Sequence, residues 1–156
     1  MFAGLENSDL KTWQSQQKTI ATLIARNARL KTKVVQKDEF EKGERRLLNF
    51  GHTLGHALEN QYGLLHGHAV AIGMVYACRI SEKLTGFDQT GRVIQLLKKY
   101  RLPTHFPFDK EKVFEVLNMD KKRERKEINY ILLDKIGKGV VRSISMKKLE
   151  SLITQL

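Results

Sequence analysis

The segment between residues 45 and 59 constrains the fold more than any other, because an apolar helical pattern there carries a row of polar side chains. Its apolar positions predict a helix that is buried on most sides. The polar side chains recur at helical spacing and therefore share one face: Arg45, Asn49, His52 and His56. A core helix with such a row usually lines a cleft, and we expect the functional site in that cleft.

Two glycines lie beside this polar row. Gly51 and Gly55 each cost about 1 kcal/mol relative to alanine in the interior of a helix. Their position predicts that something, either a backbone or a ligand, approaches this helix closely.

Helical patterns account for most of the chain. Apolar spacing predicts helices over about 9–40, 45–62, 69–84 and 93–100, a short one after Asp109 and a last one after Ser145. Gly63 and Gly86 are placed to end two of them.

Two short apolar runs, 128–133 and 140–144, are joined through Gly137-Lys138-Gly139 and predict a hairpin. We therefore expect a mainly α fold: one multi-helical domain over 1–156 with a small antiparallel β-hairpin near the C-terminus.

The charge balance favours an anionic partner. Lys and Arg number 28 against 17 Asp and Glu, a net charge of +11. A phosphorylated metabolite, nucleic acid or a membrane surface could each supply the anion. Nucleic acid is disfavoured because aromatic residues do not alternate with the bases at 121–126 and no nucleic-acid motif is present.

No apolar run approaches the roughly 20 residues of a membrane span, so no membrane-spanning helix is expected. Of the three possible anions, we expect the phosphorylated metabolite and not nucleic acid or a membrane. The single cysteine, Cys78, has apolar neighbours, which predicts a buried, inert thiol. A chain without an internal disulfide fits a reducing, cytoplasmic compartment.

Four histidines occur within a short stretch. His52 and His56 stand four positions apart on a helix and can chelate a divalent metal, with His66 and His68 following in the next loop. Thr53 stands where zinc proteases have a glutamate, which disfavours a metalloprotease.

The segment 45–59 closely resembles the 3-dehydroquinate synthase family, and its most specific part is the run Asn-Phe-Gly-His-Thr-Leu-Gly-His at 49–56. The likeness extends to the segments 31–35, 65–74 and 120–122 and to the hairpin ending at Ile136-Gly137, and it covers about 10–156. It implies a lyase of the shikimate pathway that converts 3-deoxy-arabino-heptulosonate 7-phosphate to 3-dehydroquinate and phosphate. This family uses NAD and one zinc or cobalt ion, is cytoplasmic and is commonly a homodimer.

The resemblance also implies roles for individual residues. His52 and His66 would bind the metal, while His56 would face the substrate phosphate and assist proton transfer, and Glu41 would accept a proton. The remaining substrate contacts would come from Lys31 and Arg45 at the carboxylate and ring. Asn49 and a lysine of the segment 120–122, Lys122 in preference to Lys121, would contact the phosphate.

The chain departs from the family in two respects. His68 replaces a glutamate, and the glycine-rich strand-turn-helix of the N-terminal dinucleotide-binding domain is missing. The NAD site and a third metal ligand, a glutamate, are expected in that domain, so this chain alone is expected to be inactive. Three alternatives remain: a non-catalytic anion- or metal-binding module, a sugar-phosphate cyclase with another substrate, and a metal-dependent alcohol dehydrogenase with a similar helical domain.

Overall fold

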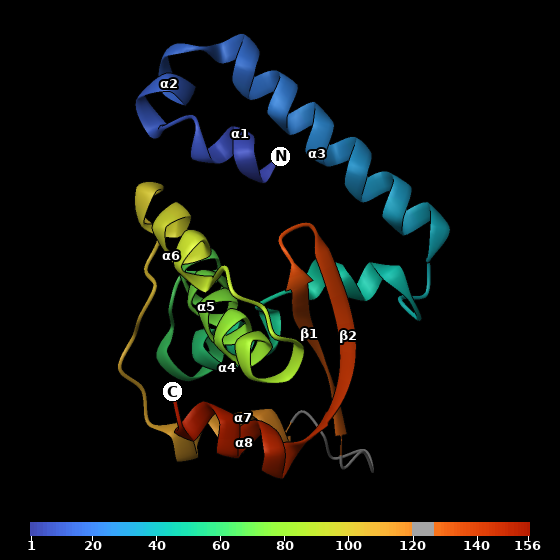
Figure 1. The fold of residues 1–156 in the computed structure, drawn as a ribbon, viewed down its shortest axis with the longest axis vertical. Helices are drawn as coiled ribbons and strands as arrows, with labels where there is room; N and C mark the ends of the chain where they lie inside the picture. The colour runs from blue at the N-terminus through green and yellow to red at the C-terminus, as the bar shows by residue number, and fades with distance from the viewer. Residues whose placement is uncertain (120–126) are drawn as a thin grey trace. The chain divides into compact units, whose positions relative to one another are not determined.

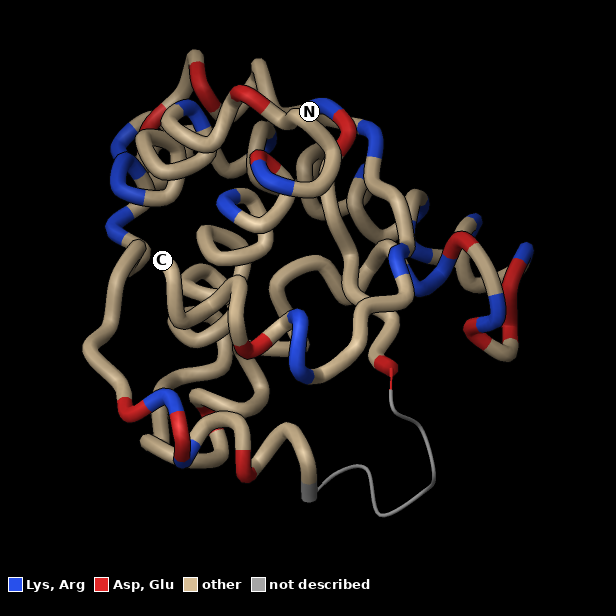
Figure 2. The backbone as a smooth tube through the Cα atoms, turned by 60° about the horizontal axis from the view of Figure 1, so that its bottom comes forward, with Lys and Arg blue, Asp and Glu red and all other residues tan. Residues whose placement is uncertain are grey.

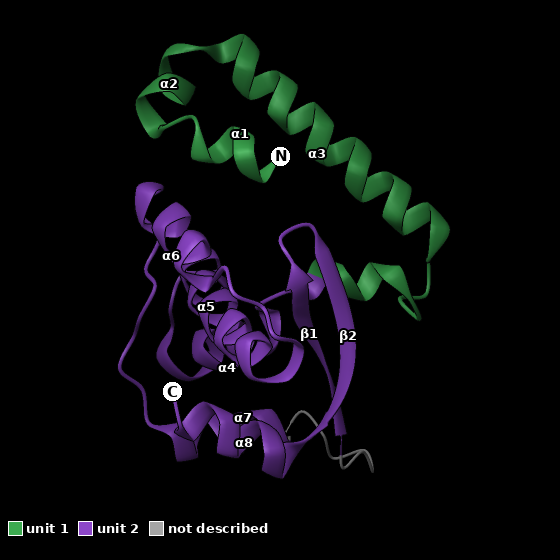
Figure 3. Ribbon diagram, in the orientation of Figure 1, with its two compact units in different colours: residues 1–48 green, residues 49–156 purple. Residues whose placement is uncertain are grey.

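The computed structural model describes residues 1–119 and 127–156 (Figure 1). The chain divides into two compact units, Met1–Leu48 and Asn49–Leu156 (Figure 3). The predicted single domain over 1–156 stays a prediction, and each unit is described by itself below.

The first unit contains the helices α1 (Phe2–Glu6), α2 (Leu10–Ser15) and α3 (Gln17–Lys37). Asp9 caps α2, because its carboxylate accepts the backbone N–H of Thr12 at 2.7 Å. The single helix predicted over 9–40 is wrong. The chain leaves helical geometry at Gln16, whose carbonyl accepts N–H groups of the next helix, and again at Asp38.

The 3-10 helix η1 (Glu44–Asn49) leads from the first unit into the second. The second unit then contains α4 (His52–Tyr62), α5 (His66–Thr85), α6 (Thr90–Lys99), α7 (Lys110–Met119), β1 (Glu127–Lys135), β2 (Lys138–Ser145) and α8 (Met146–Thr154). The two strands form one antiparallel sheet in which Ile131 stands opposite Val141. The predicted fold class, mainly helical with one hairpin near the C-terminus, is confirmed for the described residues.

The core of the second unit joins α4 and α5 to α7, α8 and the hairpin (Figure 1). Side chains without solvent exposure come from each of these elements: Leu58, Ile80, Val113, Leu132 and Leu149. Cys78 on α5 is also fully buried, and this burial raises the pKa of its thiol to about 12, as expected of an inert thiol. No membrane-spanning helix is found among the described residues, since none is both long and apolar enough.

The predicted helix boundaries of this unit follow local signals. Gly63 and Gly86 adopt left-handed conformations at the ends of α4 and α5, with φ of 63° and 73°. The carboxylate of Asp109, the residue before α7, accepts the N–H of Glu111 in the first turn of that helix. The hydroxyl of Ser145, the residue before α8, accepts the N–H of Lys148. The predicted hairpin turn has Gly137 at φ 88°. These helix ends, caps and the hairpin turn are confirmed.

The predicted start of the helix over 69–84 is wrong, because α5 begins at His66 and its first turn is closed by the N–H groups of His68 and Ala69, which donate to the Leu65 carbonyl at 2.9 and 3.0 Å. His66 and His68 therefore belong to α5 and not to a loop before it.

The continuous helix predicted over 45–62 is wrong. Gly51 has φ of 81°, a left-handed conformation that ends helical continuity between η1 and α4. Arg45 and Asn49 therefore belong to η1, whereas His52 and His56 lie on α4, and the four do not share one helical face.

The break lies at the contact between α4 and α5, where the two backbones touch. A Cβ atom on Gly51 would lie 2.7 Å from the Met74 backbone nitrogen, and one on Gly55 would lie 3.0 Å from Cα of Val70. A Cβ atom on Gly73 would overlap the Gly51 carbonyl. The close approach predicted from the glycines is thus confirmed, and the approaching group is the backbone of α5.

We expect Gly73→Ala to lower the free energy of unfolding by about 1–3 kcal/mol or more, because backbone atoms face the added methyl group and cannot rotate away. Gly91→Ala on α6 is the matched control. Nothing lies within 4 Å of its Cβ position, so a gain of about 0.5–1 kcal/mol is expected there. Urea unfolding of both variants measures the difference, and equal stabilities would contradict this account of the helix contact.

Candidate metal and substrate site

Three histidines of the second unit form a cluster at the start of α4 and α5. His52 is the first residue of α4, His56 lies one turn later, and His66 is the first residue of α5. One nitrogen from each ring lies within 4.8 Å of the others. Three imidazole nitrogens at this separation fit a divalent ion such as Zn²⁺. His68 is not part of this cluster.

The hydrogen bonds of the rings distinguish the three histidines. Nδ1 of His52 lies 3.3 Å from the Phe50 carbonyl oxygen, and Nδ1 of His66 lies 2.9 Å from Oε2 of Glu59. Because each partner is an oxygen acceptor, the Nδ1 atoms carry the hydrogen and the Nε2 lone pairs stay available. Within the described part of the chain, His56 has no such acceptor.

The charge state of His52 also suits a ligand. Burial lowers the pKa of His52 below its ordinary 6.5, and the neighbouring charges of His56 and His66 lower it further. These effects outweigh the opposing influence of the Phe50 carbonyl and Glu59. The ring is therefore neutral at pH 7, the form that binds metal ions.

A pocket of about 710 Å³ opens beside the cluster in the second unit. Asn49, His52 and His56 line it together with Glu59, and Val116 of α7 adds apolar surface. The volume is in the range of small-molecule sites. The structure thus brings three of the predicted site residues together in one pocket, although they do not share one helix.

The other predicted site residues lie elsewhere in the chain. Lys31, Glu41 and Arg45 belong to the first unit, whereas Lys122 lies outside the described residues. Lys and Arg occur on elements of both units (Figure 2).

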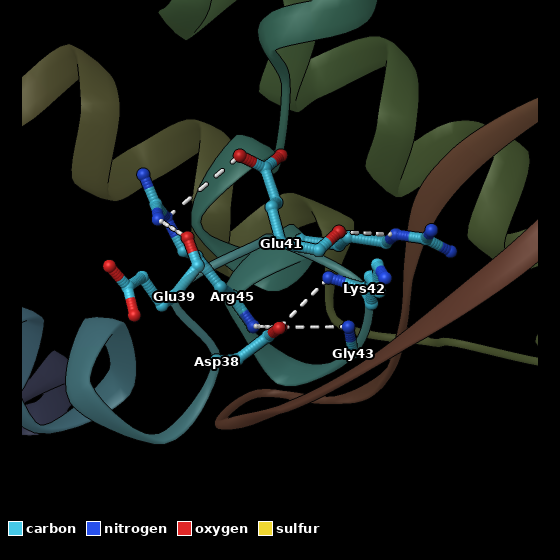
Figure 4. A network of polar contacts seen from close by, with 7 residues as sticks. Asp38, Glu39, Glu41, Lys42, Gly43 and Arg45 are labelled. Atoms are coloured by element: carbon cyan, nitrogen blue, oxygen red, sulfur yellow. Dashed lines mark hydrogen bonds and ion pairs between the residues drawn. The ribbon is translucent and has the colours of Figure 1, made fainter.

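Glu41, in the loop that follows α3, stands next to Arg45, the second residue of η1 (Figure 4). Nε of Arg45 lies 3.9 Å from Oε2 of Glu41, and the Arg45 guanidinium donates to the Glu39 carbonyl. Glu41 has φ of 54°, and its carbonyl accepts Nε–H of Arg46 at 2.9 Å. A left-handed conformation at a non-glycine residue is costly and persists only where the surroundings impose it.

Asp38 organises this loop. Its carboxylate accepts the backbone N–H groups of Lys42, Gly43 and Arg45 at 2.8, 2.7 and 3.0 Å (Figure 4). Desolvation by itself would raise the pKa of Asp38, but these hydrogen bonds and the Arg45 charge hold the pKa below its ordinary 3.8.

Sequence reasoning missed two residues that contact this machinery. Glu59 stands seven positions after His52 and three after His56, a spacing that assigns it to their face of α4. That spacing could have identified Glu59. Asp38 gave no comparable signal, because its partners are backbone amides four to seven residues further along.

Comparisons with known proteins agree on one family. A family model described as 3-dehydroquinate synthase C-terminal matches residues 1–123. The 3-dehydroquinate synthase of Methylacidiphilum infernorum (isolate V4) is 47% identical over 131 residues, which are 80% of this chain and 37% of that protein. The corresponding enzyme of Campylobacter jejuni subsp. doylei is 40% identical, over 100% of this chain and 46% of its own length.

A solved structure has the same fold. The complex of 2-deoxy-scyllo-inosose synthase with carbaglucose-6-phosphate, NAD⁺ and Co²⁺ has a TM-score of 0.75 and 27% identity, over 88% of this chain and 41% of that chain. This chain thus spans less than half the length of the relatives it matches.

The loop around Asp38 should respond to acid. Because the folded-state pKa of Asp38 is depressed, its stabilising effect is complete above the ordinary value of 3.8 and is lost as the pH falls through the lower folded value. We expect Asp38→Asn to speed amide hydrogen exchange at Lys42, Gly43 and Arg45 near neutral pH and to weaken the acid dependence of that exchange.

Glu39→Gln, which removes a charge from the adjacent residue, is the control and should leave exchange unchanged. NMR-detected hydrogen exchange across a pH series makes the measurement. Equal protection of the three amides in Asp38→Asn and the unmodified chain would contradict the assigned role of Asp38.

Proposed function

This chain belongs to the 3-dehydroquinate synthase family and corresponds to the C-terminal domain of its members, and we propose that it forms the substrate- and metal-binding part of a phosphate-eliminating cyclase. The proposed reaction converts 3-deoxy-arabino-heptulosonate 7-phosphate to 3-dehydroquinate and phosphate. The observation that carries the proposal is the cluster of His52, His56 and His66 beside a pocket that also contains Asn49.

His52 and His66 are the proposed metal ligands, through Nε2. Support comes from their Nδ1 atoms, which face the Phe50 carbonyl and the Glu59 carboxylate. When bound, a zinc or cobalt ion supplies Lewis-acid polarisation of a substrate hydroxyl, and NAD supplies the hydride chemistry.

His56 is the proposed proton-transfer group at the substrate phosphate. Its ring is exposed and lines the pocket together with Asn49, which we assign to the same phosphate. Without a hydrogen-bond acceptor in the described part of the chain, both ring nitrogens of His56 stay available for proton exchange. Elimination of phosphate needs such a group where the leaving oxygen gains charge.

The carboxylate and ring of the substrate are assigned to Lys31 and Arg45, and Glu41 is the proposed second proton acceptor. A guanidinium suits a carboxylate because it donates two parallel hydrogen bonds. Lys122 is proposed to contact the phosphate. The net charge of +11 is consistent with a substrate that carries both a carboxylate and a phosphate.

No residue of this chain is assigned to NAD. We assign the NAD site and a further metal ligand to the part of the enzyme outside these 156 residues, and propose a cytoplasmic homodimer for the whole enzyme. A second candidate is a related sugar-phosphate cyclase, favoured by the likeness to 2-deoxy-scyllo-inosose synthase bound to carbaglucose-6-phosphate.

The ligand assignment predicts unequal effects on zinc binding. His52→Ala and His66→Ala each remove a proposed ligand and should abolish zinc binding, whereas His56→Ala should largely spare it. His105→Ala, at an exposed histidine of the loop before α7, is the control. Titration calorimetry with Zn²⁺ measures the affinities, and equal losses in His52→Ala, His56→Ala and His66→Ala would show that the ligands are misassigned.

The catalytic proposal is tested by fusing this chain to the part of the Methylacidiphilum infernorum enzyme that lies outside their match. With NAD and Co²⁺, the fusion should release phosphate from 3-deoxy-arabino-heptulosonate 7-phosphate, and His56→Ala should reduce the rate about 10²–10⁴-fold. Release from glucose 6-phosphate instead would favour the second candidate. A fusion that binds cobalt but acts on neither compound would overturn the catalytic proposal.

A further inference from the structure

We propose that Glu59 is a positioning residue that fixes the tautomer and orientation of His66, so that Nε2 of this ring is presented to the metal ion. The inference rests on the proposed role of His66 as a ligand and gives a function to a residue that the family motif did not identify. Its basis is the 2.9 Å hydrogen bond between Nδ1 of His66 and Oε2 of Glu59.

The fold brings these two side chains together from different helices. Glu59 lies in the last turns of α4, and His66 is the first residue of α5. Gly63, in its left-handed conformation, ends α4 and starts the short loop that leads to α5. Both side chains therefore lie near the connection between α4 and α5, and the ring centroid of His66 is 5.7 Å from that of His56.

The His66 ring needs a partner to hold it. The His66 side chain is 55% exposed, so packing alone fixes neither the rotation nor the tautomer of the ring. The Glu59 carboxylate is 34% exposed and, when ionised, can only accept hydrogen bonds. In a neutral imidazole this acceptor selects the tautomer with hydrogen on Nδ1 and leaves the Nε2 lone pair for a metal.

The other two histidines provide an internal comparison. His52 has a backbone acceptor in the same place, the carbonyl of Phe50, which a substitution cannot remove. His56, the proposed proton-transfer group, has no acceptor within the described part of the chain. The acceptors thus coincide with the two proposed ligands, and Glu59 is the one that can be changed by mutation.

The geometry also separates positioning from direct coordination. Nδ1 and Nε2 lie on different edges of the imidazole ring, so a carboxylate bonded to Nδ1 stands away from an ion at Nε2. Loss of the carboxylate should therefore weaken metal binding through His66 without removing a ligand. An effect smaller than that of His66→Ala is expected on this account.

Two substitutions and a control test the proposal in the full 156-residue chain. Glu59→Ala should weaken Co²⁺ and Zn²⁺ affinity about 10–100-fold. Glu59→Gln should lose less, because its amide oxygen still accepts from Nδ1. Glu82→Ala removes the same charge from an exposed site on α5, about 24 Å along the helix from His66, and should bind like the unmodified chain.

A second measurement distinguishes positioning from a general structural effect and needs no metal. Nitrogen-15 NMR of the metal-free chain should find hydrogen on Nδ1 of His66. Glu59→Ala should shift this ring towards the Nε2–H tautomer and leave His52 unchanged. Glu59→Gln should keep the Nδ1–H form, and circular dichroism checks that each variant is folded.

The outcomes separate this proposal from the proposed function. Unchanged metal affinity and an unchanged His66 tautomer in Glu59→Ala would overturn the role of Glu59, while loss of binding in His66→Ala would leave the ligand assignment standing. Full metal binding in His66→Ala would overturn that assignment, and the role of Glu59 with it. Weakened binding together with the tautomer shift would support both.

Discussion

The backbone contact between α4 and α5 is the constraint on which the site depends. Gly51, Gly55 and Gly73 allow main-chain atoms of the two helices to approach each other, and a Cβ atom on Gly51 or Gly73 would overlap backbone atoms across the contact. This approach places the first residues of α4 and α5, His52 and His66, within reach of one ion. Gly51, in its left-handed conformation, also interrupts the helix before His52 and leaves Asn49 in η1. The packing of α4 against α5 therefore also determines the geometry of the site.

Features set by neighbouring residues could be predicted from the sequence. The caps at Asp109 and Ser145, the helix ends at Gly63 and Gly86, and the hairpin depend on residues a few positions apart, and all were predicted correctly. The helix break at Gly51, which lies at a contact with a distant segment of the chain, was not predicted. Apolar periodicity runs through Gly51 without interruption, whereas the atoms that leave no room for a side chain at Gly51 belong to α5, about 20 residues further along the chain.

The candidate site was predicted unevenly for a similar reason. The family motif named His52, His56 and His66, which the structure brings together, and it named Asn49 in the adjoining pocket. The residues that support the site were missed. The roles implied by the resemblance are those of residues that contact the substrate or the metal, and not of residues that position these groups. Glu59 acts across a helix junction, and Asp38 acts on backbone amides that have no residue-specific signature.

The position of His52 and His66 at the beginnings of two helices ties the occupancy of the proposed site to folding. An ion bound by both rings would join the start of α4 to the start of α5, and unfolding would require its release. By mass action, the stability of this helix pair would then rise with the concentration of free metal. Conversely, a substitution at the glycine contact that leaves every ligand in place would appear as lost metal affinity. A chelator would accordingly act as a mild denaturant of this unit.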